Sequence, residues 1–332
     1  MRYLVTGGAG FIGSHLVKSF VSQGREVRVA SDLSHLGTEN LLDLGVRGRD
    51  IELCETDLRD YRQALRAVEG VDTVFHLAAR AGSLTFLHGS SNAELAALQE
   101  NLVIDANIFR ACIEKKVKKL IYTSSWVVYS MSSQFAPEVI LPESSLEVKE
   151  LSKSQEINPD GGYGWSKLMG EIELGWIKDI DISIARLFNI YGPNGAMGEK
   201  GHVVCDLIVK AISYPQREFV VHGDGKQTRD FLYVSDCVEA LLALEKRATN
   251  PPITVNIGSG VSTSIGVIAE KVVRLSEKQI KIAYDVSKPS GPISRTSDIA
   301  KSKALLSWQP RVSLDEGLRL TYNWVEKKLR CS

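Results

Sequence analysis

The sequence has no excess of either charge and contains few cysteines. Lysine plus arginine and aspartate plus glutamate each number 40 among 332 residues, so the formal net charge is zero. No overall field therefore attracts a nucleic acid or an anionic membrane, and an anionic substrate must be held by local groups. The five cysteines are scattered, without a CxxC pair or a histidine/cysteine cluster. This pattern predicts free thiols in a reducing compartment, with neither a metal site nor disulfides.

Long hydrophobic runs are also missing. No apolar stretch approaches the length that spans a membrane, and no signal peptide precedes the first apolar run. We therefore expect a cytoplasmic enzyme without a membrane partner. The chain is long enough to bury a large core in one large domain or in two.

A glycine-rich loop lies close to the N-terminus. Residues 6–13 read TGGAGFIG, and Gly7, Gly10 and Gly13 fall at the junction between an apolar run and a helical pattern. Glycine there permits a tight turn and close approach to a pyrophosphate, and the helix points its N–H groups at the phosphates. Asp32 follows about 20 positions after the last glycine, where a carboxylate binds the adenosine ribose. Because it would repel a 2′-phosphate, and no arginine follows immediately, the pattern predicts NAD.

Strand-like and helix-like segments alternate over the first half. This alternation predicts an α/β fold, a Rossmann-type doubly wound parallel sheet, with a smaller mixed α/β substrate-binding region towards the C-terminus. We assign residues 1–190 to the NAD-binding domain, with a segment at about 232–257 returning to it, and 191–332 mainly to the substrate region. Residues 130–161, rich in Ser, Glu and Pro, are expected to form a long functional loop. The expected strands of the first half are 2–5, 26–31, 51–54, 72–77, 118–123 and 182–188, and the helices are 11–23, 60–69, 94–115 and 162–178.

Two polar motifs suggest chemistry on a sugar alcohol. Tyr163 and Lys167 are four residues apart and share a helix face. A free phenol has a pKa near 10, which a neighbouring ammonium lowers, so the pair is suited to proton removal. Alone, this spacing is a common chance pattern. Ser124 and Ser125, however, end an apolar strand, where ligands bind in doubly wound sheets.

Further motifs follow in order along nearly the whole chain: Asp57-Leu58, His76–Ala79, Arg186–Pro193 and Gly223–Phe231. With the glycine loop and the serine and tyrosine motifs, this series resembles the extended short-chain dehydrogenase/reductase family, the nucleotide-sugar epimerases and their relatives. The resemblance implies NAD as cofactor, a UDP- or GDP-hexose as substrate, and no metal.

The resemblance also implies individual roles. The catalytic set is Ser125, Tyr163 and Lys167, with Ser124 as the alternative if the register shifts by one. Arg186 lies in an apolar strand, where a structural role is at least as strong an expectation. Cofactor contacts are implied for Gly7, Gly10, Phe11, Ile12, Gly13, Asp32, Asp57, Leu58, Leu77, Ala78, Ala79, Tyr163 and Lys167, and substrate contacts for Ser125, Asn189, His202, Val203, Arg229 and Arg295, the two arginines at the diphosphate.

The residues at positions 126 and 127 narrow the range of reactions that the family resemblance allows. Dehydrating relatives carry an Asp-Glu pair there, decarboxylating relatives a glutamate at position 127, and C3/C5 epimerases a cysteine at 127. Trp126 and Val127 cannot move protons, which favours C4 epimerisation with NAD recycled in place, or simple oxidation or reduction. In contrast, residues 81–87 and 316–322 resemble GDP-mannose 3,5-epimerases, and His202 lies near the acid position of that group.

Two amphipathic helices, 94–115 and 162–178, are explained in part by core packing. In the family, the equivalent helices pair across a two-fold axis, so the resemblance implies a homodimer. A function of another class, a non-catalytic NAD-binding scaffold or sensor, is less expected because such proteins usually lose the Ser/Tyr/Lys set that this chain retains.

Overall fold

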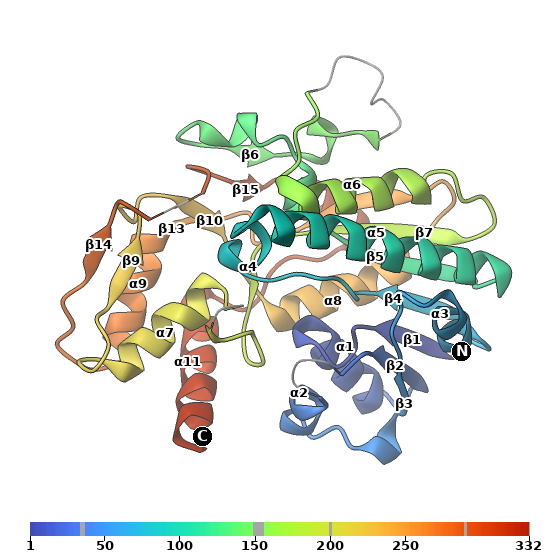
Figure 1. The fold of residues 1–332 in the computed structure, drawn as a ribbon, viewed down its shortest axis with the longest axis horizontal. Helices are drawn as coiled ribbons and strands as arrows, with labels where there is room; N and C mark the ends of the chain where they lie inside the picture. The colour runs from blue at the N-terminus through green and yellow to red at the C-terminus, as the bar shows by residue number, and fades with distance from the viewer. Residues whose placement is uncertain (34–36, 149–155, 199–200, 289–290, 332) are drawn as a thin grey trace.

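The computed structural model describes residues 1–33, 37–148, 156–198, 201–288 and 291–331 (Figure 1). A central seven-stranded sheet has the order β12-β7-β5-β4-β1-β2-β3, and all its neighbouring strands are parallel. This order confirms the predicted doubly wound fold. The strands are β1 Tyr3–Thr6, β2 Val27–Ser31, β3 Glu52–Glu55, β4 Thr73–His76, β5 Lys119–Ser125, β7 Asp181–Leu187 and β12 Ile253–Ile257.

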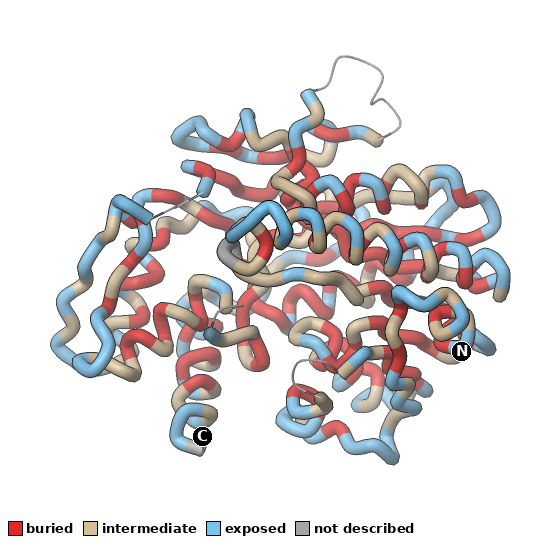
Figure 2. Tube along the Cα trace, viewed as in Figure 1, coloured by how far each residue is buried: buried red, intermediate tan, exposed pale blue. Residues whose placement is uncertain are grey.

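Helices cover both faces of the sheet, which explains why its inner strands are apolar and fully buried (Figures 1 and 2). One core packs α1 and α8 against the sheet, together with side chains of α2 and α10. The other core packs α3, α5 and α6. The bounds are α1 Phe11–Ser22, α2 Glu39–Asp43, α3 Tyr61–Val68, α4 Leu84–His88, α5 Ser91–Glu114, α6 Gly161–Leu174, α8 Val234–Glu245 and α10 Ala300–Leu306.

Local signals set the ends of the two long helices near the expected site. Helix α5 starts earlier than predicted because the Ser90 hydroxyl accepts a hydrogen bond from the Ala93 N–H. Helix α6 ends at Leu174, before the predicted residue 178, where Gly175 follows as the C-cap.

The C-terminal region forms a smaller unit with its own apolar core. It is built on α7 Val203–Ser213, α9 Ile265–Leu275 and α11 Leu314–Cys331, beside the pair β9 Val220–His222 and β14 Ala283–Asp285. Two further pairs join it to the loops at the end of the sheet. These are β8 Ile190–Tyr191 with β11 Leu232–Tyr233, and β10 Thr228–Asp230 with β13 Ser262–Ser264. Strand β12 lies beside β7, so a segment from beyond residue 190 returns to the main sheet, while the domain boundary stays a prediction.

The segment 130–161 is more ordered than the predicted loop. It contains β6 Ile140–Leu141 and 3₁₀ turns at Ser132–Phe135 and Glu143–Ser145; a third, Trp126–Val128, precedes it. Strand β6 pairs in parallel with β15 Thr296–Ser297, which sequence periodicity cannot reveal in a two-residue strand. Residues 149–155 of the predicted loop lie outside the described residues. Among the residues described, no helix is long and apolar enough to cross a membrane.

Candidate active site

The glycine loop joins β1 to α1 and lies against the end of β4. Gly7 has a φ of +67°, and a Cβ on it would lie 2.9 Å from the Ala78 nitrogen. A Cβ on Gly13 would lie 2.2 Å from the Gly7 oxygen, so the loop requires glycine at both positions. Gly10 is exposed and caps α1, whose first turn contains no acidic residue. The free N–H groups and the absent side chains therefore fit a pyrophosphate.

The remaining predicted loop contacts lie around this cradle. Phe11 and Ile12 are half-buried at the start of α1, and Leu77 and Ala79 are half-buried beside Ala78. These residues are thus brought to one edge of the sheet, at the carboxyl ends of β1 and β4.

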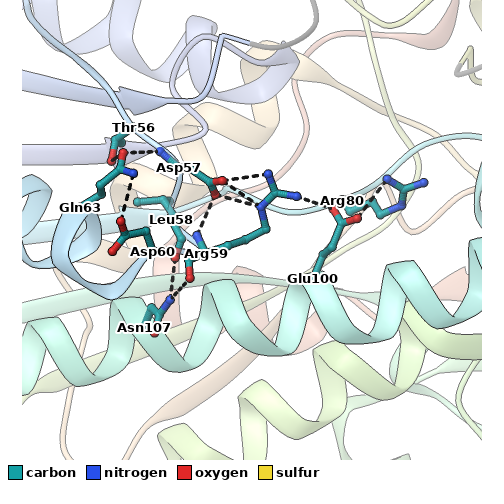
Figure 3. Close-up of polar contacts among 9 residues, drawn as sticks. All are labelled: Thr56, Asp57, Leu58, Arg59, Asp60, Gln63, Arg80, Glu100 and Asn107. Atoms are coloured by element: carbon teal, nitrogen blue, oxygen red, sulfur yellow. Dashed lines mark hydrogen bonds and ion pairs between the residues drawn. The ribbon is translucent and has the colours of Figure 1, made fainter.

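The predicted adenosine end is more charged than the sequence suggested (Figure 3). Asp32 is exposed directly after β2. Asp57 accepts hydrogen bonds from the Arg59 side chain at 2.8–3.1 Å, and these bonds lower the pKa of its carboxyl. Glu100 lies 3.8 Å from the same guanidinium. Leu58 is buried in the core under α3 and α5, so its main role in the protein alone is packing.

The two adjacent serines at the end of β5 have different environments. The Ser124 hydroxyl donates to Glu171 Oε1 at 2.5 Å, and Glu171 also forms a fully buried ion pair with Arg186 at 2.7 Å. Ser124 and Arg186 therefore belong to a structural network. Among the residues that the structure describes, the Ser125 hydroxyl has a single long bond, which it accepts from the Val127 N–H at 3.5 Å. Its hydroxyl remains able to bond a substrate oxygen, which favours the predicted register.

Helix α6 brings Tyr163 and Lys167 to this strand end. The Asp160 N–H, just before α6, donates to the Val127 oxygen at 2.9 Å, so the helix begins against the turn that follows Ser125. The Lys167 ammonium lies 4.6 Å from the centroid of the Tyr122 ring and is almost fully buried. The catalytic roles of Ser125, Tyr163 and Lys167 stay predictions, but the fold gathers all three.

Burial and nearby charges shift the pKa values of both Tyr163 and Lys167. Burial, followed by the charge of Asp105, raises the pKa of the Tyr163 phenol. Burial lowers the pKa of Lys167, while the negative charges of Asp105 and Glu171 oppose that shift. In the protein alone the phenol is therefore neutral at pH 7, and the phenolate needs added positive charge.

Asp105, on α5, is the main residue that the sequence reasoning missed. Its Oδ2 accepts from the Tyr122 hydroxyl at 2.5 Å, and its Oδ1 lies 3.0 Å from His76 Nε2. The other His76 nitrogen lies 2.6 Å from Thr6 Oγ1, at the end of β1. Although burial acts against the charge, Lys167 and the bond from His76 hold the pKa of Asp105 below its usual value. Two polar residues one turn apart on the buried face of α5, Asn101 and Asp105, were the available signal.

The two predicted substrate arginines are both buried, with different partners. Arg229 Nη1 donates to the carbonyl oxygens of Thr228 and Pro292 at 2.7 and 2.8 Å. Arg295 instead stacks on Trp126, with its Cζ 3.2 Å from the ring centroid. Its Nε and Nη1 have no hydrogen-bond partner among the residues that the structure describes. Donors of this kind suit a phosphate.

The remaining predicted substrate residues are Asn189, His202 and Val203, which precede both arginines in the sequence. Asn189 is half-buried and donates to the Asp230 oxygen at 3.0 Å. His202 is exposed at the N-cap of α7, and Val203 is half-buried in the first turn. Asp230 was not singled out from the sequence, but its carboxylate binds Ser259, Gly260 and Ser297 and so joins β10 to the loop after β12 and to β15. Within the described ranges, no three His, Cys, Asp or Glu side chains gather as metal ligands.

Comparison with known proteins shows the family of the chain. The model of the NAD dependent epimerase/dehydratase family matches residues 3–258. GDP-mannose 3,5-epimerase of Arabidopsis thaliana is 33% identical over 337 residues, covering 99% of this chain and 83% of that protein. The UDP-N-acetyl-alpha-D-glucosaminuronate decarboxylase of Bacillus cytotoxicus is 31% identical over 97% of both chains.

Solved structures show the same fold. UDP-glucose 4-epimerase of Thermotoga maritima, solved with UDP-glucose, has a TM-score of 0.85 at 27% identity and covers 99% of this chain and 100% of its own. UDP-glucuronic acid 4-epimerase of Bacillus cereus, solved with UDP-glucuronic acid and NAD, has a TM-score of 0.81 at 26% identity over 99% and 100%. The family match confirms the predicted cofactor, NAD, which the glycine cradle fits. The chain belongs to the NAD dependent epimerase/dehydratase family.

Proposed function

We propose that this enzyme epimerises a nucleotide sugar at C4 of the hexose, through a transient 4-keto sugar, with NAD recycled in place. The observation that carries the proposal is what surrounds Ser125. Tyr163 and Lys167 are gathered at the same strand end, while Trp126 and Val127 are buried and cannot transfer protons. Dehydration and decarboxylation need an acid or base at those two positions, whereas C4 epimerisation needs only the Ser/Tyr/Lys set and a hydride carrier.

Each residue has a defined task in this reaction. The Tyr163 oxygen removes the proton of the sugar hydroxyl and later returns it. The Ser125 hydroxyl bonds the same sugar oxygen as it passes between alcohol and ketone. Lys167, held between Tyr122 and the negative charge of Asp105, supports the phenolate electrostatically. NAD, when bound, supplies a positively charged acceptor that takes the hydride and gives it back. Gly7, Gly10 and Gly13 would hold its pyrophosphate, and Asp32 its adenosine ribose.

A second candidate, epimerisation at C3 and C5, is favoured by the 33% identity to GDP-mannose 3,5-epimerase. His202, accessible at the start of α7, supplies one group able to exchange a proton. That chemistry also needs a partner on the opposite side of the sugar, and Val127 stands at the position of the family's cysteine. We therefore rank this candidate, together with simple oxidation or reduction, below C4 epimerisation.

The deciding experiment incubates the NAD-loaded protein with a panel of UDP- and GDP-hexoses, including UDP-glucuronic acid, and separates the products. The expected result is one C4 epimer, without net NADH and without release of CO₂. A C3 or C5 epimer would replace the leading proposal with the second candidate. Accumulating NADH without an epimer would identify a dehydrogenase.

We also propose that two copies pair through α5 and α6, as the family resemblance implies. These two helices pack side by side (Figure 1). Exposed apolar side chains lie on both, including Leu95 and Ile113 on α5 and Trp165, Met169 and Trp176 on or just after α6. Light scattering during gel filtration should give twice the chain mass of 36.5 kDa, and Met169→Glu should halve it. A wild-type protein that elutes as a monomer would refute this proposal.

A further inference from the structure

The Trp126 ring lies against the buried guanidinium of Arg295, a contact that goes beyond the inability of Trp126 to transfer protons. The Arg295 Cζ lies 3.2 Å from the centroid of the Trp126 ring, and both side chains are at least nine-tenths buried. A guanidinium over an indole face is stabilised by the ring's negative face. Stacking of this kind occupies the flat face of the guanidinium and leaves the edge, which carries the N–H donors, for another partner.

The edge of the Arg295 guanidinium carries buried donors. Its Nε and Nη1 are shielded from solvent and have no partner within the described part of the chain. A buried donor that stays unpaired is costly, and a buried charge more so. Burial, together with the positive charge of Arg229, holds the pKa of Arg295 well below its usual value. A bound anion would remove all of these penalties together.

The backbone around Arg295 is held rigidly at this position. The Ser294 N–H donates to the Gln134 oxygen, and the Thr296 N–H donates to the Val139 oxygen at 2.9 Å. The Ser297 N–H donates to the Asp230 carboxylate at 3.0 Å. The chain is thus fixed on both sides of Arg295, and within the described ranges its side chain contacts the Trp126 ring.

Trp126 is also adjacent in sequence to Ser125, the predicted catalytic serine. The ring therefore places the Arg295 guanidinium at a fixed offset from the point where the sugar oxygen would bind. In dehydrating relatives this position holds the aspartate of an Asp-Glu pair, as the family resemblance implies. Here it holds a large aromatic platform instead.

We propose that Trp126 is a positioning residue that orients Arg295 to bind the diphosphate of the substrate, and that it thereby sets the affinity for nucleoside diphosphates. The proposal rests on the nucleotide-sugar substrate proposed above, but not on which carbon reacts. It predicts that Trp126 contributes to binding through Arg295 alone. The aromatic face matters here, and the size of the side chain does not.

The test measures binding of UDP and GDP by calorimetry to the NAD-loaded wild type and to Trp126→Leu, Trp126→Phe, Arg295→Gln and the double variant Trp126→Leu/Arg295→Gln. Trp126→Leu should raise the dissociation constant about 30-fold, which is the loss of affinity expected when a desolvated cation–π contact is removed. Trp126→Phe keeps a ring face and should stay within about 3-fold of wild type. The matched control is Phe135→Leu, which changes an exposed aromatic side chain in the same segment and should bind as wild type does.

The double variant separates positioning from general packing. If Trp126 acts through Arg295, Trp126→Leu adds no further loss once Arg295 is glutamine. Losses that multiply, or a Trp126→Leu protein with wild-type affinity, would overturn the proposal, as would a wild type that binds neither diphosphate. With an active substrate, Trp126→Leu should raise KM and leave kcat nearly unchanged. A fall in kcat alone would mean that Trp126 acts on Ser125. If the binding pattern holds but no epimer forms from any sugar, this inference stands and the proposed reaction fails.

Discussion

Replacing each of the adjacent serines by alanine should separate stability from catalysis. Ser124→Ala removes a buried hydrogen bond of 2.5 Å to the Glu171 carboxylate. Bonds to charged groups contribute about 2 kcal/mol, and the unfolding entropy of a chain of 332 residues converts that into a fall in Tm of roughly 3 °C. Ser125 has only a long bond from a backbone N–H to lose. Ser125→Ala should therefore leave Tm unchanged but lower kcat roughly 100-fold, because it removes a donor to the reacting oxygen.

The assay compares thermal unfolding of the two NAD-loaded variants with their turnover of the substrate found in the panel. Bound NAD is quantified in both samples, so that a change in cofactor content is not mistaken for lost chemistry. The expected result is that Ser124→Ala loses stability but keeps its activity, whereas Ser125→Ala keeps its stability but is nearly inactive. An inactive but stable Ser124→Ala, beside an active Ser125→Ala, would show that the catalytic register is shifted by one residue.

Three further predictions concern the tyrosine, its buried counter-charge and the glycine loop. Tyr163→Phe should lower kcat by about 10²–10⁴-fold while retaining NAD, and a protein isolated without NAD would contradict the role of the phenol. Asp105→Asn removes the negative charge that most opposes the lowered pKa of Lys167 and should cost about 3 kcal/mol of unfolding free energy, measured in urea at pH 7. Because the folded pKa of Asp105 is lowered, its contribution exists above the carboxyl's unfolded pKa and is lost as pH falls through the folded value, so wild type and variant should converge in acid. Gly13→Ala places a Cβ 2.2 Å from a backbone oxygen of its own loop and should abolish NAD binding in a fluorescence titration, whereas Gly48→Ala, with nothing within 4 Å, should bind normally.

The main sheet could be predicted because its signals are local. Strands β1, β2 and β5 are short apolar runs followed by helical patterns, and parallel strands buried on both faces leave little ambiguity. The pairing of β6 with β15 could not be predicted in this way. Two residues at Ile140–Leu141 meet two at Thr296–Ser297, so no periodicity marks either strand. Through that pairing, the expected long loop packs against the segment that carries Arg295.

The residues of the candidate site also fall into two groups, those marked by a local motif and those placed by contacts between distant segments. The glycine loop, Tyr163 and Lys167 were found because each forms a compact motif in the sequence. Asp105 and the stacking of Arg295 on Trp126 depend on contacts between distant segments, which no local pattern records. A family resemblance supplied the roles of single residues, but it described position 126 only by the acidic residue that dehydrating members carry there.

The joining of β6 to β15 also fixes the order in which the enzyme can be assembled on the ribosome. The Val139 N–H bonds the Ser294 hydroxyl across a sequence separation of 155 residues. Domains generally fold from the N-terminus during synthesis, at about 5–20 residues per second. The glycine loop is therefore translated well before Arg295. The pairing of β6 with β15, which holds the backbone beside Arg295, can form only after residues 294–297 have been made.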